Sequence, residues 1–311
     1  MTYSADQTPI YRGRFAPSPT GPLHFGSLIA AVGSFLESRT RGGEWLVRME
    51  DVDRPREVAG AADAILRTLE MLGLEWDGEV LYQSRRTEVY RHALEELRRA
   101  GAVYPCSCSR REINKLAERG PDGAVYPGTC RNGVASGREP KAWRVRVDHP
   151  VRYRDQLQGL YYVDLGRQSG DFVVLRADGI FAYQLAVVVD DAEQQINSIV
   201  RGTDLLGSTA RQIHLQRLLG LPMPEYLHLP IAVDDQGRKL SKQTNALAVD
   251  AGAGAAALVP VLRFLGHNPP AELCRAPLAE FWAWALAHWN VSQVPASRSL
   301  PAPGNATTGL D

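Results

Sequence analysis

The sequence predicts an α/β fold built on a parallel sheet of the doubly wound kind. Two observations lead to this prediction. Segments with strand and helix character alternate over the first hundred residues, and the same alternation resumes at Phe181. Parallel strands need long connections, and a helix is the usual one. The 311 residues, 44% of them hydrophobic, are enough to bury the core of such a sheet.

The elements are expected in a regular order. Strands are expected at IYRGRFA (10–16) and EWLVRME (44–50), with a helix between them from about His24 to Arg39. That helix is indicated by apolar residues at helical spacing, namely Leu28, Ile29, Val32, Phe35 and Leu36. Further elements are expected as helices at 58–72, 87–100 and 205–219 and a strand at 227–233.

The alternation breaks in the middle of the chain and again at its end. Residues 104–138 contain Cys, Gly and Pro with little periodicity, which indicates an insertion, and the short strands AWRVRV, GLYYVDL and DFVVLR follow. The last segment, SQVPASRSLPAPGNATTGLD, is rich in Pro, Ser, Gly and Thr, so we expect a disordered tail.

Charge and composition narrow the function classes. Lys plus Arg and Asp plus Glu both number 35, so no strongly basic balance points to nucleic acid, although a local basic face would suffice to bind RNA. No apolar run is long enough to span a bilayer, and MTYSADQTPI lacks the basic start and apolar core of a signal peptide. We therefore expect a cytoplasmic protein without membrane contact.

A phosphate site is predicted after the first strand, in RFAPSPTGPLHFGS (14–27). The strand leads into a rigid Pro/Gly loop, and a helix begins near His24, where unpaired N–H groups and the positive end of the helix dipole favour phosphate. His24 could donate a hydrogen bond to a phosphate oxygen, and Gly26 would let a base or sugar approach closely. Taken alone, H-x-G-S is more often an ordinary Pro-rich loop before a helix.

A second cationic loop is predicted near the end of the sheet, in DDQGRKLSKQTNA (234–246). Lys239 and Lys242 could neutralise the charge that builds on a leaving pyrophosphate. A surface turn with solvated lysines is the commoner explanation for any single K-x-x-K. The order of the two motifs on an α/β pattern favours the catalytic interpretation.

At these residues the chain resembles a known family. RFAPSPTGPLHFGS resembles the first signature of class I aminoacyl-tRNA synthetases in its glutamyl form, and KLSKQ resembles their lysine signature. VRMED (47–51) and the stretch 181–220 match as well, so the resemblance covers roughly residues 10–245. Two positions depart from the pattern. Ser27 replaces a second histidine, which weakens a two-histidine phosphate clamp, and Gln243 replaces a serine.

The resemblance implies a Rossmann-type catalytic sheet divided along the chain. Residues 8–103 would form its first half, and 104–180 an insertion with a zinc site and a small β region. Residues 181–245 would form the second half with the lysine loop, 246–292 a short helical part and 293–311 the disordered tail.

The resemblance also implies a glutamate pocket and an ATP site. Glutamate carries two carboxylates and one ammonium group, so a selective pocket needs fixed cations and a fixed anion. The planar guanidinium of arginine suits a carboxylate, because it can pair with both oxygens. Arg14 and Arg201 would be the cations, Glu50 would meet the amino group and Tyr183 would donate a hydrogen bond. The loop residues that would line the glutamate site are Phe15, Ala16, Pro17 and Ser18. The residues that would bind ATP, with Mg²⁺, are His24, Gly26, Lys239, Ser241 and Lys242, of which His24 and Lys242 would be catalytic.

A metal site is predicted in the insertion. Cys106, Cys108 and Cys130 are three thiols in one short stretch, and in a reducing compartment such a group favours Zn²⁺, which takes four ligands. The resemblance implies Tyr126 as the fourth ligand. Reduced cysteines without metal are the alternative, and the isolated Cys274 is expected to be structural.

The length of the C-terminal part bears on the expected substrate. Only 69 of the 311 residues follow Lys242, too few for the helical anticodon-reading domain of full glutamyl enzymes. The chain in this respect is similar to the glutamyl-queuosine tRNA(Asp) synthetases, which attach glutamate to queuosine in the anticodon loop. This implies a monomer that binds glutamate, ATP and the anticodon arm of tRNA(Asp). Conventional acylation of a tRNA 3′ end, a small-molecule adenylyltransferase and a non-catalytic RNA-binding paralogue remain alternatives.

Overall fold

The computed structural model describes residues 10–121, 123–240 and 247–304. Two parallel arrays lie at its centre. In the first, β1 (Arg12–Phe15), β2 (Glu44–Met49) and β3 (Leu81–Tyr82) pair in that order, and in the second, β11 (Ser198–Gly202) pairs with β12 (Glu225–Leu229). The arrays adjoin at β1 and β11, because the backbone N–H of Asn197 donates to the carbonyl oxygen of Arg12 at 3.2 Å. The predicted α/β fold with a parallel sheet is therefore confirmed.

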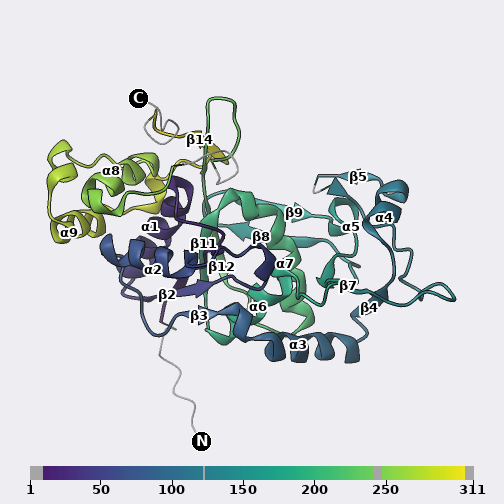
Figure 1. The fold of residues 1–311 in the computed structure, drawn as a ribbon. Helices are drawn as coiled ribbons and strands as arrows, with labels where there is room; N and C mark the ends of the chain where they lie inside the picture. Colours follow the sequence, from purple (N-terminus) through teal and green to yellow (C-terminus); the bar gives the residue numbers. More distant parts are fainter. Residues whose placement is uncertain (1–9, 122, 241–246, 305–311) are drawn as a thin grey trace, which may run out of the picture.

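Helices connect these strands, as the alternation predicted (Figure 1). The expected helices are observed as α1 (Phe25–Thr40), α2 (Ala61–Met71), α3 (Thr87–Arg99) and α7 (Leu206–Leu218), and α6 (Tyr183–Glu193) precedes β11. Helix α1 follows β1 and α7 follows β11. The chain thus leaves the centre of the sheet in opposite directions from β1 and from β11, which makes this junction a topological switch point.

The first hydrophobic core forms around α1. Trp45 is completely buried, and its ring lies edge-on to Phe35 with a centroid distance of 5.2 Å. Gly33 allows α1 to approach the sheet closely, because a Cβ there would lie 2.4 Å from Leu229 Cδ1 of β12. This contact holds the middle of α1 against the carboxyl end of β12.

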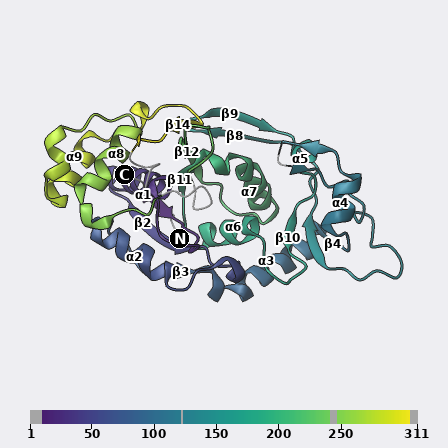
Figure 2. The same ribbon diagram turned by 45° about the horizontal axis from the view of Figure 1, so that its top comes forward.

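The middle of the chain forms a separate region at one end of the molecule (Figure 2). Its antiparallel sheet has the order β10 (Val173–Leu175), β7 (Ala142–Val145) and β4 (Val103–Cys106). Around it lie α4 (Arg110–Leu116), α5 (Leu165–Gln168), β5 (Arg119–Gly120) and β6 (Gly123–Ala124). Strands β7 and β10 occupy the segments AWRVRV and DFVVLR that were expected to be strands.

Strands β4, β5 and β6 were not expected in this region, and neither was the strand at Val151–Asp155. Strand β8 (Val151–Asp155) pairs with β9 (Gly159–Val163), and β8 also bonds to β12, which extends the second parallel array. Its residues alternate between buried and exposed, so VRYRD has only two apolar inward residues, Val151 and Tyr153. The third inward residue is Asp155, and this buried carboxylate obscured the strand pattern.

The C-terminal part packs against α1 rather than standing apart (Figure 1). Helices α8 (Ala255–Phe264) and α9 (Leu278–His288) contribute to the same core, with Trp282 packed on Phe35 at 4.8 Å between ring centroids. The expected disordered tail from residue 293 is wrong for the described residues. Strand β14 (Ser299–Pro301) pairs in parallel with β13 (Ile231–Val233), because an extended Pro-containing segment can add to a sheet edge.

Short 3₁₀ turns connect several elements, at Arg54–Arg56, Gln83–Arg85, Thr203–Leu205, Ala251–Ala253, Ala271–Arg275 and Val291–Gln293. Among the described residues, none of the helices has the length and hydrophobicity that a membrane crossing requires.

Candidate active site

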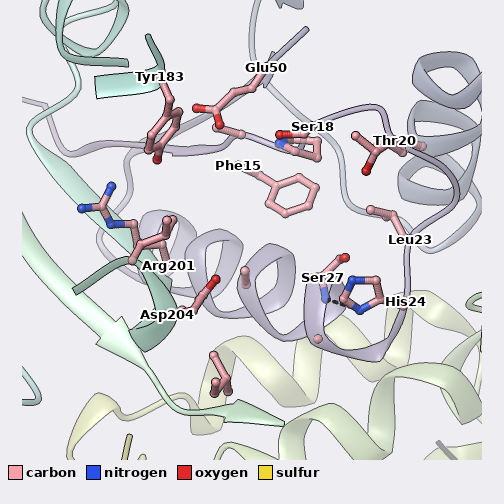
Figure 3. A pocket seen from close by; sticks show the side chains of 18 of the residues that line it. Phe15, Ser18, Thr20, Leu23, His24, Ser27, Glu50, Tyr183, Arg201 and Asp204 are labelled. Carbon is pink, nitrogen blue, oxygen red and sulfur yellow. Dashed lines mark hydrogen bonds between the residues drawn. The ribbon is translucent and has the colours of Figure 1, made fainter. Parts of the chain in front are cut away.

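A cavity of about 760 Å³ opens at the switch point between β1 and β11. Ligands of open α/β sheets bind at the carboxyl ends of strands at such a point. The wall is built from the ends of β1, β2 and β11 and the first turn of α1. Figure 3 shows two ends of the cavity: Tyr183, Glu50 and Arg201 gather at one, and His24 and Ser27 lie at the other.

The start of α1 forms the His24 end of the cavity. His24 is the N-cap residue of the helix, and its Nδ1 accepts a hydrogen bond from the backbone N–H of Ser27 at 3.3 Å. A neutral imidazole that accepts at Nδ1 carries its proton on Nε2, so Nε2 is a donor. The helix start and this donor together suit a phosphate. A Cβ on Gly26 would lie 3.1 Å from His24 Cε1, so a larger residue would crowd the imidazole.

Arg14 and Glu50 are held by a buried network of charges. The Arg14 Nε donates to Asp191 Oδ1 at 3.0 Å, and Arg48 Nη2 donates to the same oxygen at 2.7 Å. The Arg48 side chain is fully buried and also lies 3.7 Å from Glu50 Oε1. Asp191 thus neutralises two guanidinium groups and fixes the position of Arg14 at the cavity wall.

Glu50 is the acidic group of the wall. Its Oε1 is buried and has no hydrogen-bond partner among the described residues. Burial raises the pKa of Glu50 to about 7, against the lowering effect of Arg48 and Arg14. Beside it, burial and the Glu50 carboxylate raise the pKa of Tyr183 to about 12, so the phenol is protonated and can donate a hydrogen bond. A cationic ligand group would stabilise the ionised form of Glu50.

Arg201 is the second cation of the wall. Its Nη2 donates to Thr209 Oγ1 at 2.8 Å and to Gln212 Oε1 at 2.7 Å, and its Nε donates to His228 Nε2 at 3.1 Å. The remaining nitrogen, Nη1, is buried with no hydrogen-bond partner among the described residues. Buried polar groups are nearly always paired, so this atom indicates a ligand acceptor.

Charged pairs also border the cavity. Lys239, which comes from the lysine loop, donates to Asp204 Oδ2 at 2.5 Å. Asp53 accepts from Arg176 at 2.8 Å and from Arg56 at 2.7 Å. All five residues line the cavity, so both signs of charge are present along its wall.

The structure brings together most residues that the sequence singled out. The predicted residues that line the one cavity are Arg14, Phe15, Ala16, Pro17, Ser18, His24, Gly26, Glu50, Tyr183, Arg201 and Lys239. Ser241 and Lys242 lie outside the described residues. The roles assigned to all of these residues remain predictions.

Sequence reasoning missed the residues behind the wall. Arg48 lies within the quoted VRMED and Asp191 within VVVDD, and neither received a role. Both are charged residues inside otherwise apolar segments, which is a signal for a buried ion network. Asp155 and His228, which lie behind Arg201, gave no comparable motif.

The cysteine group lies outside the cavity, in the insertion. The Sγ atoms of Cys106, Cys108 and Cys130 all lie within 4.8 Å of one another. The Tyr126 hydroxyl is 3.3 Å from Cys106 Sγ and 3.6 Å from Cys108 Sγ. Tetrahedral zinc with bonds of about 2.3 Å separates its sulfur ligands by about 3.8 Å, so the cysteine group is compact enough to be a candidate metal site.

The electrostatic environment differs between the thiols of the cysteine group, because burial raises the pKa of Cys108 to about 11. Arg144 Nε donates to Cys106 Sγ at 3.4 Å, and its guanidinium lies over the Tyr126 ring at 3.8 Å from the centroid. Burial would raise the pKa of Cys130, but hydrogen bonds from the Ser107 backbone and the Tyr126 hydroxyl lower it to about 7.

Comparison with known proteins assigns the fold. The family model for the catalytic domain of class I tRNA synthetases (E and Q) matches residues 11–271. The structure of a glutamate tRNA ligase from Elizabethkingia meningosepticum in complex with its amino acid superimposes with a TM-score of 0.77 at 23% identity, covering 96% of this chain and 68% of that one. The fold is that of a class I synthetase catalytic domain, an α/β fold with a parallel sheet.

Curated relatives show to which family of class I synthetases the chain belongs. The chain is 56% identical over 299 residues to a protein of Aromatoleum aromaticum, covering 96% of this chain and 95% of the relative. It is 58% identical to one of Dechloromonas aromatica (94% and 98% covered) and 59% identical to one of Chromobacterium violaceum (92% and 96% covered). All three carry the name glutamyl-Q tRNA(Asp) synthetase. The chain therefore belongs to this family of class I synthetase-like ligases.

Proposed function

We propose that this chain uses ATP to convert glutamate into glutamyl-adenylate and transfers the glutamyl group to the queuosine base in the anticodon loop of tRNA(Asp). The observation that carries the proposal is the identity of 56–59% with relatives named for this reaction, over more than nine tenths of the chain. The charges of the cavity support it, because two arginines and one glutamate complement the two carboxylates and one ammonium of glutamate.

Glutamate occupies the Arg201 end of the cavity in this proposal. Arg14 and Arg201 bind the carboxylates, Tyr183 donates a hydrogen bond, and the unpaired Oε1 of Glu50 accepts from the ammonium group. The loop residues 15–18 close one wall of the same site. Binding of a cation and an anion at once satisfies the buried Oε1 of Glu50 and Nη1 of Arg201.

ATP, with Mg²⁺, occupies the His24 end. An oxygen of the glutamate α-carboxylate attacks the α-phosphorus, and the bond to pyrophosphate breaks. The carboxylate is already a nucleophile, so the step needs alignment and charge neutralisation rather than a base. His24 and the start of α1 bind the phosphate, Gly26 leaves room for the nucleoside, and Lys239, which is paired with Asp204, belongs to the same site. Ser241 and Lys242 are assigned to this site from the sequence motif alone.

Transfer completes the reaction. A hydroxyl oxygen of the queuosine base attacks the carbonyl carbon of the adenylate, AMP leaves, and the hydroxyl proton is released. Single-stranded loop bases can be turned outward and read individually, so an anticodon-loop base can reach a cavity. We propose that the anticodon arm of tRNA(Asp) binds one copy of the chain in the cytoplasm, where the charged tRNA is used.

The insertion holds a structural zinc ion in this proposal. Cys106, Cys108 and Cys130 supply thiolates and Tyr126 supplies the fourth ligand, as their spacing allows. The zinc organises the loops between β4 and β7 and takes no part in the reaction. Elemental analysis of chelator-free protein is expected to give one zinc per chain, and well under one would contradict the site. Metal retained with unchanged affinity in Tyr126→Phe would assign the fourth position to another ligand.

Labelled glutamate, ATP and purified tRNA test the acceptor. Glutamate is expected to attach to tRNA(Asp) that contains queuosine and not to the unmodified transcript of the same tRNA or to tRNA(Glu). Glutamate and ATP alone are expected to support pyrophosphate exchange. Attachment to the unmodified transcript that is blocked by oxidising its 3′ ribose would show a conventional synthetase, and no exchange with glutamate would exclude the proposed activation.

A further inference from the structure

Arg201 is held from behind by two buried side chains that the proposed reaction does not touch. Its Nε donates to His228 Nε2 at 3.1 Å, and His228 Nδ1 lies 2.6 Å from Asp155 Oδ2. The side chains of His228 and Asp155 are 0% exposed. The three residues come from three neighbouring strands, β11, β12 and β8, so the row crosses the sheet from its interior to the cavity.

The row has one possible arrangement of protons. The Nε of arginine can only donate, so His228 Nε2 must accept. The proton of the imidazole therefore lies on Nδ1 and points to Asp155. Burial lowers the pKa of His228 to about 4, so the ring is neutral at pH 7, as this arrangement requires. The other carboxylate oxygen, Asp155 Oδ1, accepts the backbone N–H groups of Leu157 at 3.0 Å and Gln158 at 2.8 Å.

We propose that Asp155 and His228 are positioning residues for glutamate recognition. Asp155 fixes the tautomer of His228, His228 fixes the Nε edge of Arg201, and Nη1 is thereby presented to a substrate carboxylate. Thr209 and Gln212 hold Nη2, so every nitrogen of the guanidinium except Nη1 is occupied within the described residues. This inference rests on the proposed function and adds the means by which its second cation is oriented.

Orientation matters because charge alone does not select glutamate. A guanidinium pairs strongly with a carboxylate only when its planar N–H groups face the oxygens. An Arg201 that can rotate keeps its charge, but it distributes that charge over several directions and binds a carboxylate less well. The row should therefore lower the KM for glutamate while leaving the KM for ATP, which binds at the other end of the cavity, unaffected.

Two substitutions of the same residue separate this role from simple packing. In His228→Gln the side-chain amide oxygen can take the place of Nε2 and accept from Arg201, although the bond to Asp155 is lost. In His228→Asn the shorter amide can take the place of Nδ1 and donate to Asp155, but nothing accepts from Arg201. Both changes remove a buried ring, so a packing role predicts similar effects.

The measurement is glutamate-dependent pyrophosphate exchange. His228→Asn is expected to raise the KM for glutamate about 10- to 100-fold, the loss of one hydrogen bond to a charged group, with the KM for ATP unchanged. His228→Gln is expected to recover most of that loss. His214→Asn serves as the matched control, because His214 is also buried and bonded, to the Arg146 carbonyl at 2.7 Å, but lies away from the cavity wall. Its KM for glutamate should match that of the unchanged chain.

Asp155→Asn gives a second, independent test if the His228 variants fold poorly. The amide oxygen would remain on the Leu157 and Gln158 N–H groups, so the NH₂ group would face Nδ1 and move the imidazole proton to Nε2. That proton would oppose the Arg201 N–H, as happens when the aspartate of a serine-protease triad is replaced by asparagine. The KM for glutamate should rise at least as far as in His228→Asn.

The outcomes distinguish this inference from the proposed function. Suppose that the unchanged chain shows glutamate-dependent exchange. Equal increases of the KM for glutamate in His228→Asn and His228→Gln would then overturn the positioning role, as would no increase in His228→Asn and Asp155→Asn. Either result leaves the proposed function intact. Absence of glutamate-dependent exchange in the unchanged chain overturns both.

Discussion

Single residues of the cavity wall carry charges whose state depends on what is bound. Glu50 is buried beside Arg48 and Arg14, yet burial dominates and raises the pKa of its carboxyl to about 7. Asp191 lies behind it, and the two guanidinium groups hold the pKa of Asp191 below its usual range despite complete burial of the site. Burial therefore shifts the pKa of Glu50 in the cavity wall upward, whereas the guanidinium groups shift that of Asp191 behind the wall downward.

The pH dependence of glutamate use follows from Glu50. The ammonium group of the substrate needs an ionised Glu50, and a pKa of about 7 leaves about a tenth of the carboxyl groups ionised at pH 6. We expect kcat/KM for glutamate in pyrophosphate exchange to fall about tenfold for each pH unit below 7, while the KM for ATP changes little. A flat profile between pH 6 and pH 8 would show that Glu50 does not meet the ammonium.

The stability of the unchanged chain has the opposite pH dependence, which a Glu50→Gln variant should remove. The folded-state pKa of Glu50 lies above the ordinary value of 4.5, so protonation stabilises the fold fully below about pH 4.5 and this stabilisation is lost as pH rises through about 7. Glutamine removes the ionisation. The Tm of the variant minus the Tm of the unchanged chain should therefore increase by a few degrees from pH 5 to pH 8, while glutamate-dependent exchange is lost. The same Tm difference at pH 5 and at pH 8 would contradict the raised pKa of Glu50.

Asp191 is expected to matter for both stability and substrate binding. Asp191→Asn leaves Arg14 and Arg48 buried without their shared carboxylate, which costs about 3–5 kcal/mol of unfolding free energy, and the KM for glutamate should rise because Arg14 is no longer held. Urea denaturation and exchange kinetics measure the two effects. Asp148→Asn is the control, because its pair with Arg131 is more than half exposed at the carboxylate and should contribute at most about 1 kcal/mol.

At the scale of secondary-structure elements, the first turn of α1 combines a helix cap with the proposed phosphate site. His24 Nδ1 caps the helix through Ser27, which leaves Nε2 as the donor of the same ring. One residue thus caps the helix start and, in the proposed function, binds phosphate, so substitutions can separate the two effects.

Asparagine and alanine at position 24 are expected to separate these effects. His24→Asn keeps a side-chain acceptor for the Ser27 N–H, so Tm should change little, whereas His24→Ala loses the cap and about 1 kcal/mol. Both variants lose the Nε2 donor, and both should lower kcat of pyrophosphate exchange about 100-fold, the usual cost of one transition-state donor. Full activity in His24→Asn would show that His24 acts mainly as the helix cap and not as a phosphate donor.

At the scale of the whole molecule, the buried residues form separate clusters. One surrounds α1 and the C-terminal helices, a second lies under α3, α6 and α7, and a third, small one contains the cysteine group. The third lies in the insertion at one end of the molecule, and none of its residues lines the cavity (Figure 2). The cavity and the cysteine group therefore depend on different cores.

Loss of the metal site should separate activation from transfer. Cys108→Ser is expected to remove zinc and to leave glutamate-dependent pyrophosphate exchange within about threefold of the unchanged chain, because the cavity is built from another core. Transfer to tRNA(Asp) should fall much further if the insertion contacts the RNA. A parallel loss of exchange and transfer would show that the insertion supports the cavity itself.

Local patterns in the sequence determined much of the fold. The helical spacing of apolar residues placed α1 within one residue of its observed ends, and the strands β1, β2, β7 and β10 fall on the apolar runs that predicted them. The loop motif and the charged residues that resemble a synthetase pocket pointed to Arg14, His24, Glu50, Tyr183 and Arg201, which the fold brings to one cavity. Such patterns are local because backbone geometry repeats every 3.6 or two residues.

Only the tertiary structure decided what lies behind those residues. Strand β14 comes from a Pro- and Ser-rich segment whose order depends on the open edge of β13, a partner nearly seventy residues away. The row from Asp155 through His228 to Arg201 joins three strands that are distant in the chain. The periodicity of a sequence cannot predict such contacts. The buried polar side chains of this row are stable only together, because each supplies hydrogen bonds that the next one needs.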